Sequence, residues 1–381
     1  LDFSILKCYH NKKGKGGDLM EDILGVLSRE EYLSFELRAL YNKYGYKLYK
    51  MSKFEAYDLY ARNKEFLSGE NMITFTDNKG TLLALKPDVT LSIIKSMPEE
   101  IKGVQKVCYD ENVYRQQKGE SFKEILQLGL ECVGEIDLYQ TCEVLCLAIK
   151  SMELIKAPFV LELSHMGLIL AAMGASGVVP NDYEQVLGII KAKNKAAMNA
   201  FCAEKKIFAQ GAKTLETFIT SFGEPNAVLA SFVPLNAKMA DALDELSAIC
   251  KIIKSVSTAA VRIDFCCLND LSYYNGIVFQ GFVEGVPHNI LSGGRYDALA
   301  AKMGKNAGAI GFALSLNDLA YLPEEEEDEE ETVLIYADEP PAEVLARAEE
   351  LINQGEKVSV QKFLPPKANF AKVCRVKEEQ Q

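Results

Sequence analysis

Two long strand-like stretches, residues 103–114 and 122–133, constrain the fold of this chain most. A short loop around Lys118-Gly-Glu120 joins them, which predicts an antiparallel pair. Successive side chains of a strand point to opposite faces. In the second stretch one face is apolar and consists of Leu126, Leu128, Leu130 and Cys132. The other face is polar and consists of Gln127, Gly129 and Glu131. This polar face offers hydrogen-bonding groups with room for a ligand between them. Taken alone, however, the strand is better explained as half-exposed, with its polar face in contact with solvent.

Other periodic patterns place helices and further strands around this pair. Helices are predicted over residues 19–45, where Ser28-Arg-Glu-Glu31 forms a capping box, from Asp137 to about Met152, and over most of 167–255. A hairpin is predicted over 72–85, strands over 159–166, 261–268 and 276–285, and a strand entering a helix over 307–322. Strands and helices therefore do not alternate regularly, which favours an α+β fold with an antiparallel sheet.

A block of eight acidic residues, 324–331, separates a large part of the chain from a small one. Like charges repel each other, so residues 323–332 are predicted to be an extended linker. The segment 333–381 then contains a single β-α-β pattern, which has too few strands for a full independent domain. The predicted organisation is a core of residues 1–322 with a helical insertion at about 167–255, the linker, and a truncated α/β segment.

Composition excludes several classes of function. The net charge is −12 and no basic stripe is visible, which argues against a protein that grips a long nucleic-acid surface. The ten cysteines form no Cys-x-x-Cys pair, which is typical of buried thiols in a reducing cytosol. Only three histidines occur, far apart, so no metal site is expected. Neither a membrane-spanning run nor a secretory signal is apparent, so a cytoplasmic protein is expected.

Several polar and aromatic residues could serve a ligand, and each has a plainer interpretation. Asp88 and Thr90 precede an apolar helical run, where either could be the helix N-cap. Tyr273 and Tyr274 could be a core tyrosine beside a surface one. The segment SGGRYD, residues 292–297, could be a tight turn whose glycines adopt positive φ. Each feature alone is weak evidence for a ligand site. The order in which they occur together along the chain is much stronger evidence.

That order resembles the core of the class II aminoacyl-tRNA synthetases, specifically the histidyl-tRNA synthetase group. The matching segments are LALKPDVT, YRQQKGESFKEILQLGLECVG, LSYYNGIVFQG, SGGRYDALAAKMG and GAIGFALSLNDL, which span most of residues 1–322. The resemblance implies an antiparallel sheet flanked by helices and a pocket for histidine. Asp88, Thr90 and Gln127 would hold its ammonium group, Glu131, Tyr273 and Tyr274 its imidazole, and Arg115 its carboxylate.

The departures from that family concern catalysis. The family's arginine before the tyrosine pair is replaced by Asn269 or Asp270, and the arginine of the third motif by Asp318. The second-motif loop keeps Arg115, but its glutamate is a glutamine and its second arginine has become part of ESFK. The first-motif proline is absent from YKMSKFE, and the anticodon-binding domain is reduced to about fifty residues. Adenylate formation needs cations on the phosphates, and each lost donor typically costs roughly 3 kcal/mol. No catalytic residue, metal or cofactor is therefore expected.

A histidine pocket without an ATP site is similar to the regulatory subunits of ATP phosphoribosyltransferase, which are synthetase paralogues. The resemblance implies a homodimer that joins the short catalytic subunit in a hetero-octamer, activates it in the first step of histidine biosynthesis and mediates feedback inhibition by free histidine. It implies no tRNA and no membrane partner. Two alternatives stay open, namely a divergent histidine–tRNA ligase and a stand-alone histidine-binding paralogue.

Overall fold

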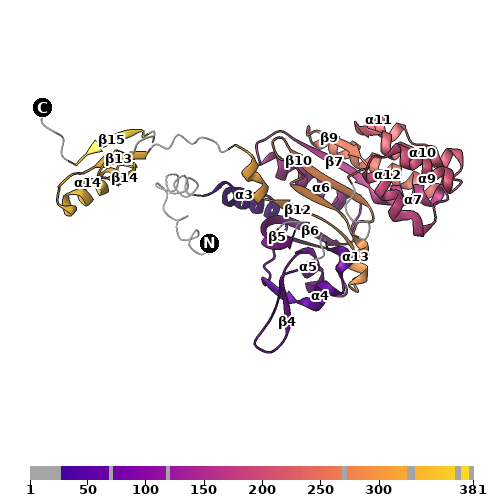
Figure 1. The fold of residues 1–381 in the computed structure, drawn as a ribbon, viewed down its shortest axis with the longest axis horizontal. Coiled ribbons are helices and arrows are strands. Elements are labelled where there is room, and N and C mark those ends of the chain that lie inside the picture. Colours follow the sequence, from indigo (N-terminus) through magenta and orange to yellow (C-terminus); the bar gives the residue numbers. More distant parts are fainter. Residues whose placement is uncertain are drawn as a thin grey trace. The chain divides into compact units, whose positions relative to one another are not determined.

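The computed structural model describes residues 27–67, 72–116, 121–267, 273–323, 331–364 and 370–376 (Figure 1). The chain divides into two compact units, Leu1–Tyr321 and Leu322–Gln381. Some sequence predictions lie outside the described residues: the start of the first helix, the loop at 118–120, Asn269 and Asp270, and residues 324–330 of the acidic block.

The first unit is built on a large, mostly antiparallel sheet, which in the described residues has nine strands. In order across the sheet they are β1 (Lys47–Leu48), β5 (Val104–Gln116), β6 (Phe122–Gly134), β12 (Gly308–Ser315), β11 (Leu291–Arg295), β10 (Ile277–Val283), β7 (Phe159–His165), β9 (Val261–Asp264) and β8 (Phe222–Gly223). The two long predicted strands are β5 and β6, which pair antiparallel from Val104 opposite Gly134 to Gln116 opposite Phe122. The predicted α+β fold, an antiparallel sheet flanked by helices, is confirmed.

Two capped helices cover one face of this sheet. In α3 (Arg29–Lys43) the Ser28 hydroxyl and the Glu31 carboxylate form the predicted capping box, and Asp137 caps α6 (Leu138–Glu153) with Gln140. Tyr41 of α3 packs edge-on against Phe312 of β12, with ring centroids 6.0 Å apart. Leu128 and Leu130 of β6 are fully buried. Each such side chain stabilises the fold by roughly 1.5–3 kcal/mol, so the apolar stripe of β6 anchors the sheet.

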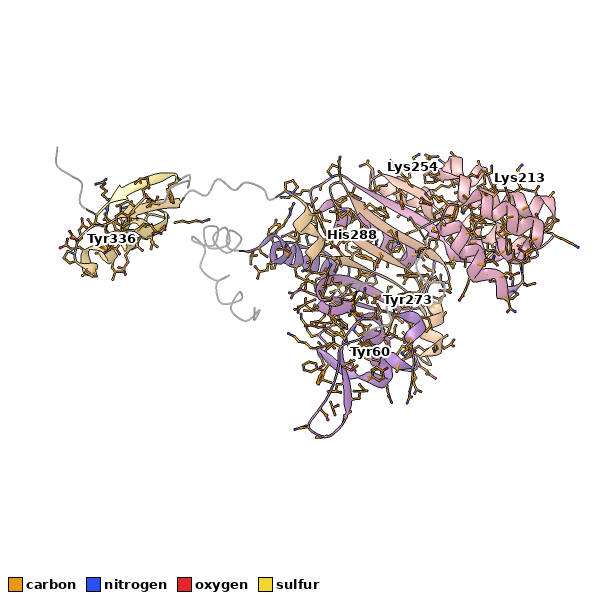
Figure 2. All side chains as sticks on the ribbon, viewed as in Figure 1. Tyr60, Lys213, Lys254, Tyr273, His288 and Tyr336 are labelled. Carbon is orange, nitrogen blue, oxygen red and sulfur yellow. The ribbon has the colours of Figure 1, made fainter. Side chains whose placement is uncertain are left out.

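The opposite face of the sheet carries a second apolar cluster and the polar side chains of β6. The small elements here are η1 (Lys64–Phe66), α4 (Tyr57–Ala61), α5 (Thr90–Ser96), α13 (Asp297–Lys302) and the sheet β2 (Phe54–Ala56), β4 (Leu82–Leu85) and β3 (Thr74–Thr76). The predicted hairpin corresponds to β3 and β4, with Asp77 accepting two backbone hydrogen bonds in the turn. Tyr60, labelled in Figure 2, belongs to the cluster together with Tyr109 and Tyr296.

A block of helices, residues 166–256, lies beside β7, β9 and β8 at one end of the sheet (Figure 1). Its members are α7 (Met166–Ala175), η2 (Pro180–Asp182), α8 (Tyr183–Lys191), α9 (Lys195–Glu204), α10 (Ala209–Thr220), α11 (Pro225–Ala230) and α12 (Ala237–Val256). We call this segment the helical block. Among the helices that the structure describes, none combines the length and the apolar character that crossing a membrane requires.

The structure differs from three local predictions. Strand β9 ends at Asp264, short of residue 268, because the Asp264 carboxylate accepts the Cys266 N–H at 2.9 Å and closes a turn. The predicted helix after β12 is the 3-10 helix η3 (Asn317–Tyr321). The second unit contains β13 (Glu331–Ile335), α14 (Pro341–Asn353) and β14 (Lys357–Gln361), as predicted, but also a third parallel strand, β15 (Lys372–Arg375). That strand has four largely exposed residues, too few to give a periodic signal.

Glycines permit the close approach of strands next to the polar face of β6. A Cβ atom at Gly311 of β12 would overlap the Glu131 carboxylate and the Leu130 carbonyl oxygen. A Cβ at Gly129 would overlap the Tyr109 ring and the Phe312 carbonyl oxygen. The gap at Gly129 is thus filled by Tyr109, so the space over this glycine that the sequence suggested for a ligand is occupied by protein.

We expect Gly311→Ala to destabilise the protein by about 1–3 kcal/mol, because the added methyl group must displace a buried carboxylate. Gly188→Ala is the matched control. Gly188 lies in α8 with no neighbouring atom within 4 Å of the new Cβ, so its replacement should be neutral or stabilising by up to about 1 kcal/mol. Urea unfolding of both variants measures the difference, and equal stabilities would contradict the packing described.

Candidate functional site

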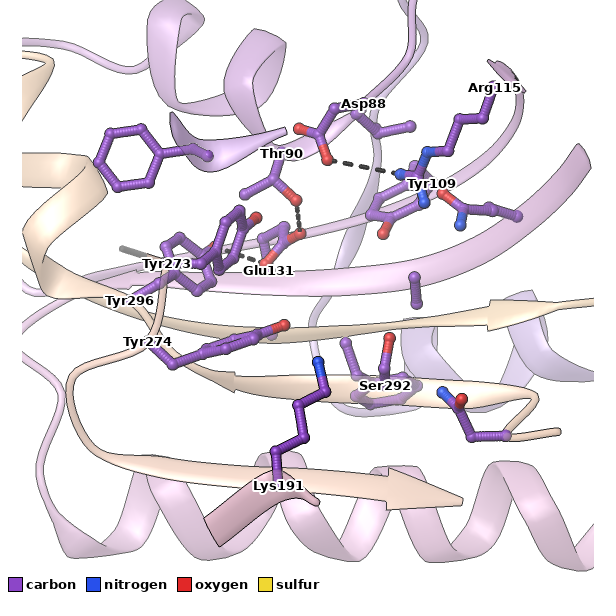
Figure 3. A pocket seen from close by; sticks show the side chains of 17 residues that line it. Asp88, Thr90, Tyr109, Arg115, Glu131, Lys191, Tyr273, Tyr274, Ser292 and Tyr296 are labelled. Carbon is purple, nitrogen blue, oxygen red and sulfur yellow. Dashed lines mark hydrogen bonds and ion pairs between the residues drawn. The ribbon is translucent and has the colours of Figure 1, made fainter. Parts of the chain in front are cut away.

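A cavity of about 370 Å³ opens over β6, on the face opposite the α3 and α6 helices (Figure 3). All seven site residues predicted from the sequence line this cavity: Asp88, Thr90, Arg115, Gln127, Glu131, Tyr273 and Tyr274. They come from separate elements, namely the start of α5, the end of β5, the middle of β6 and the segment that enters β10. The structure therefore brings together residues that are up to 186 positions apart in the sequence.

Glu131 lies at the floor of the cavity and is 2% exposed, so the solvated-face interpretation of β6 was wrong. The Thr90 hydroxyl donates to its Oε1 at 2.6 Å, and the Tyr296 hydroxyl donates to its Oε2. Burial raises the pKa of Glu131 to about 8, against the opposing effect of these two hydrogen bonds. This raised pKa favours the protonated form of the carboxyl group at neutral pH, and a further hydrogen-bond donor or a positive charge on a ligand would favour the ionised form.

Asp88 combines the two interpretations that the sequence left open. Its Oδ1 accepts the Leu91 N–H at 2.8 Å in the first turn of α5, although the N-cap residue itself is Val89. Its Oδ2 lies 3.7 Å from Nη2 of Arg115 and faces the cavity. Burial raises the pKa of Asp88, while the Arg115 charge and two backbone N–H groups oppose the rise. Nε of Arg115 also donates to the Pro87 carbonyl oxygen at 2.6 Å, which fixes the guanidinium at the cavity wall.

A buried ion pair anchors the segment that carries Asp88 and Thr90. The Lys86 side chain is 1% exposed and pairs with Glu111 of β5. The Lys86 carbonyl oxygen accepts the Tyr114 N–H at 3.0 Å, so backbone and side chain both hold this segment against β5. Removing one partner of such a pair leaves a buried, unpaired charge, which makes the position of this segment strongly determined.

Aromatic side chains form one wall of the cavity. The rings of Tyr273 and Tyr274 lie 4.7 Å apart between centroids, and Tyr273 lies 5.6 Å from Tyr296. Both Tyr273 and Tyr274 are half-buried and line the cavity, so neither is the plain surface residue of the alternative interpretation. Burial raises the pKa of each of these three tyrosines above its ordinary value, so their hydroxyl groups are neutral and can both donate and accept hydrogen bonds.

The segment SGGRYD is not a turn. Residues 291–295 are β11, and neither Gly293 nor Gly294 has a positive φ. A Cβ at Gly294 would overlap the ring of Tyr274, and one at Gly293 would overlap Phe312. Both glycines are therefore required by close packing, Gly294 against the Tyr274 ring and Gly293 against Phe312, whereas the turn interpretation attributed them to backbone conformation.

Further lining residues were not predicted from the sequence. Tyr109 lies opposite Gly129 in the β5–β6 register, a relation that becomes visible only once the pairing is known. Tyr296 was within reach of the sequence because it belongs to the SGGRYD segment. Lys191 comes from α8 of the helical block, and no sequence signal links it to this cavity.

Two charged clusters lie away from the cavity lining. Asp318, at the position where the resemblance leads to an arginine, pairs with Nε2 of His288 at 3.0 Å. Among the described residues, ligand-type atoms of Glu162, Asp264 and Cys267 also approach one another. The Lys193 ammonium pairs with Asp264 at 2.6 Å and supplies the positive charge that this acidic group requires.

The cavity has complementary chemistry for a small zwitterion that carries a ring N–H. Asp88 can accept from an ammonium group, Glu131 from a ring N–H, and Arg115 and Lys191 supply cations for a carboxylate.

Known proteins resemble this chain in sequence. The family description of histidyl-tRNA synthetase matches residues 24–319. The ATP phosphoribosyltransferase regulatory subunit of Clostridium novyi (strain NT) is 30% identical over 313 residues, 79% of this chain and 74% of that protein. The one from Caldanaerobacter subterraneus subsp. tengcongensis is 28% identical over 341 residues, which cover 86% of this chain and 89% of that protein.

Solved structures share the fold. An ATP phosphoribosyltransferase regulatory subunit/histidyl-tRNA synthetase from Bacillus halodurans has a TM-score of 0.73 at 21% identity, over 91% of this chain and 93% of that one. An ATP phosphoribosyl transferase (HisG:HisZ) complex from Thermotoga maritima has a TM-score of 0.60 at 22% identity, over 76% of this chain and 98% of the matched chain.

Glu131→Gln should change how stability depends on pH. The pKa of Glu131 in the folded protein, about 8, lies above the ordinary value near 4.5. The stability that protonated Glu131 contributes is therefore fully present below about pH 4.5 and is lost as the pH rises to about 8. Relative to the wild type, the variant should gain up to about 1.4 kcal/mol in free energy of unfolding per pH unit across this range.

Urea unfolding between pH 5 and 8 measures this trend. Glu124→Gln, which removes an exposed carboxylate from the same strand, is the control for the loss of one charge. Parallel stability profiles for wild type and Glu131→Gln would contradict the raised pKa.

Proposed function

The chain belongs to the family of ATP phosphoribosyltransferase regulatory subunits, which share the histidyl-tRNA synthetase fold, and on this premise we propose that it binds free histidine and regulates a short catalytic subunit. In this role the catalytic partner needs the chain for activity in the first step of histidine biosynthesis, and histidine binding inhibits the pair. The observation that carries the proposal is one cavity lined by all seven residues that the resemblance assigns to histidine.

The geometry supports a specific arrangement of the ligand. Its ammonium group lies near Asp88, Thr90 and Gln127, and its imidazole lies between Glu131 and the tyrosines Tyr273 and Tyr274. The Thr90 hydroxyl already donates a hydrogen bond to Oε1 of Glu131, at 2.6 Å between the two oxygens. Toward the ammonium group it therefore acts as an acceptor. Arg115 receives the carboxylate. The Glu131 carboxyl group beside the ring discriminates against amino acids that lack a ring N–H, because they bring no donor that favours its ionised form.

The same site is poorly suited to activate histidine with ATP. Adenylate formation requires cations on the phosphates. Where the resemblance leads to an arginine in the third motif, Asp318 is present and pairs with His288. An aspartate there repels a triphosphate. We therefore propose that the chain has no aminoacylation activity and binds no tRNA, in keeping with the absence of a basic stripe in its sequence.

Regulation requires that histidine bind one quaternary arrangement better than another. Such coupling typically amounts to about 1–3 kcal/mol. We propose that this chain forms a homodimer and that it assembles with the catalytic subunit into a hetero-octamer. The division into a core of residues 1–322 with an insertion at about 167–255, a linker at 323–332 and a C-terminal segment at 333–381 is part of the same proposal.

Glu131→Gln should weaken histidine binding by roughly 1–3 kcal/mol, because the amide cannot offer the ring N–H a charged acceptor. Isothermal titration calorimetry of the purified chain measures the affinity. Glu124→Gln on the same strand should bind histidine as the wild type does. Unchanged affinity of Glu131→Gln would place the imidazole elsewhere.

The regulatory role predicts the behaviour of the mixed subunits. Adding this chain to a short ATP phosphoribosyltransferase catalytic subunit should raise its activity, and histidine should inhibit the pair; with Glu131→Gln, activation should persist while inhibition needs more histidine. If the two chains neither associate nor gain activity, a stand-alone histidine-binding protein is the better description. Histidine-dependent exchange of pyrophosphate into ATP by this chain alone would instead identify a ligase.

A further inference from the structure

Lys191 is the one described residue of the helical block that lines the cavity. It is the last residue of α8, and its ammonium group points into the cavity toward the hydroxyl of Tyr274 (Figure 3). Its side chain is exposed. Among the residues that the structure describes, no carboxylate forms an ion pair with it. A lysine aimed at a binding site without such a partner has a free charge to offer to a ligand.

The other cation of the cavity is already engaged. Nε of Arg115 donates to the Pro87 carbonyl oxygen at 2.6 Å, and Nη2 lies 3.7 Å from Asp88. The carboxylate of an amino acid at this site therefore meets a guanidinium that is shared with two protein groups. A second cation, coming from the opposite wall, would complete its binding.

We propose that Lys191 binds the carboxylate of the amino acid held in this cavity, so that occupancy of the cavity ties the helical block to the central sheet. This inference rests on the proposed function and adds the element that responds to the ligand. Asp88, Glu131 and Arg115 all belong to the sheet or to the segment packed on it, whereas Lys191 belongs to the helical block. Histidine thus bridges two parts of the first unit, and a ligand without a carboxylate does not.

Helix α8 is well placed to pass this contact on. Tyr183 at its first turn lines a second, wider groove of about 840 Å³ between α7, α12 and the ends of β10 and β11. Adjacent residues near those strand ends line different spaces. Tyr274 and Tyr296 line the cavity, whereas their neighbours Asn275 and Arg295 line the groove. A shift of α8 that follows Lys191 toward a carboxylate therefore reaches both spaces.

The experiment compares two ligands on matched variants. Histamine has the ring and the ammonium group of histidine but no carboxylate. For Lys191→Met we expect the dissociation constant for histidine to rise about tenfold, the scale of one charge-assisted hydrogen bond, and that for histamine to stay unchanged. Lys213→Met is the control for net charge, because Lys213 is exposed on α10, well away from Tyr273 (Figure 2). Lys191→Arg should restore most of the affinity for histidine.

Each outcome decides the inference. Equal weakening of both ligands would mean that Lys191 only maintains the shape of the cavity, and unchanged binding of histidine to Lys191→Met would mean that it makes no contact; either result overturns the proposal. Amide hydrogen exchange gives a second measure: histidine, but not histamine, should slow exchange in α8 of the wild type. If the wild type binds no histidine at all, the proposed function fails, and this inference fails with it.

Discussion

The burial of one carboxyl group, Glu131, is the constraint on which the rest of the site depends. An ionised carboxylate in an apolar interior is too costly to remain without partners. Thr90 from α5 and Tyr296 after β11 supply hydrogen bonds, and Gly311 of β12 leaves the space that the group occupies. Three segments from distant parts of the sequence must therefore meet at one strand position. This requirement places the polar face of β6 next to the tyrosines of the aromatic wall.

The same constraint links recognition to regulation in the proposed function. Burial raises the pKa of Glu131 to about 8, which favours a neutral carboxyl group at physiological pH. A ligand that brings a ring N–H favours the ionised form of Glu131. The free energy gained depends on how closely the walls surround the ligand. Lys191 of the helical block lines this cavity. The free energy of ligand binding can therefore favour one arrangement of the block over another.

Much of the fold and of the site was predictable because the signals are local. The alternation in 125–133 identified β6 and its two faces, and the helix caps at Ser28 and Asp137 marked where α3 and α6 begin. Interpretation failed where packing decides the role of a residue. The glycines of SGGRYD have ordinary strand conformations; Gly294 is required by the ring of Tyr274 and Gly293 by Phe279 and Phe312. Strand β15 was missed because four exposed residues carry no period.

By itself, the sequence determined the motifs that resemble the histidyl-tRNA synthetase group, and through them the candidate groups for a ligand: the acids Asp88 and Glu131, the cation Arg115 and a pair of tyrosines. Motifs and periodicity are properties of short segments, so they can be seen without coordinates. Only the tertiary structure decided that Glu131 is buried, that Tyr109 fills the gap at Gly129 and that Lys191 lines the same cavity. Burial and proximity arise from contacts between segments far apart in the chain, and such contacts leave no local pattern in the sequence.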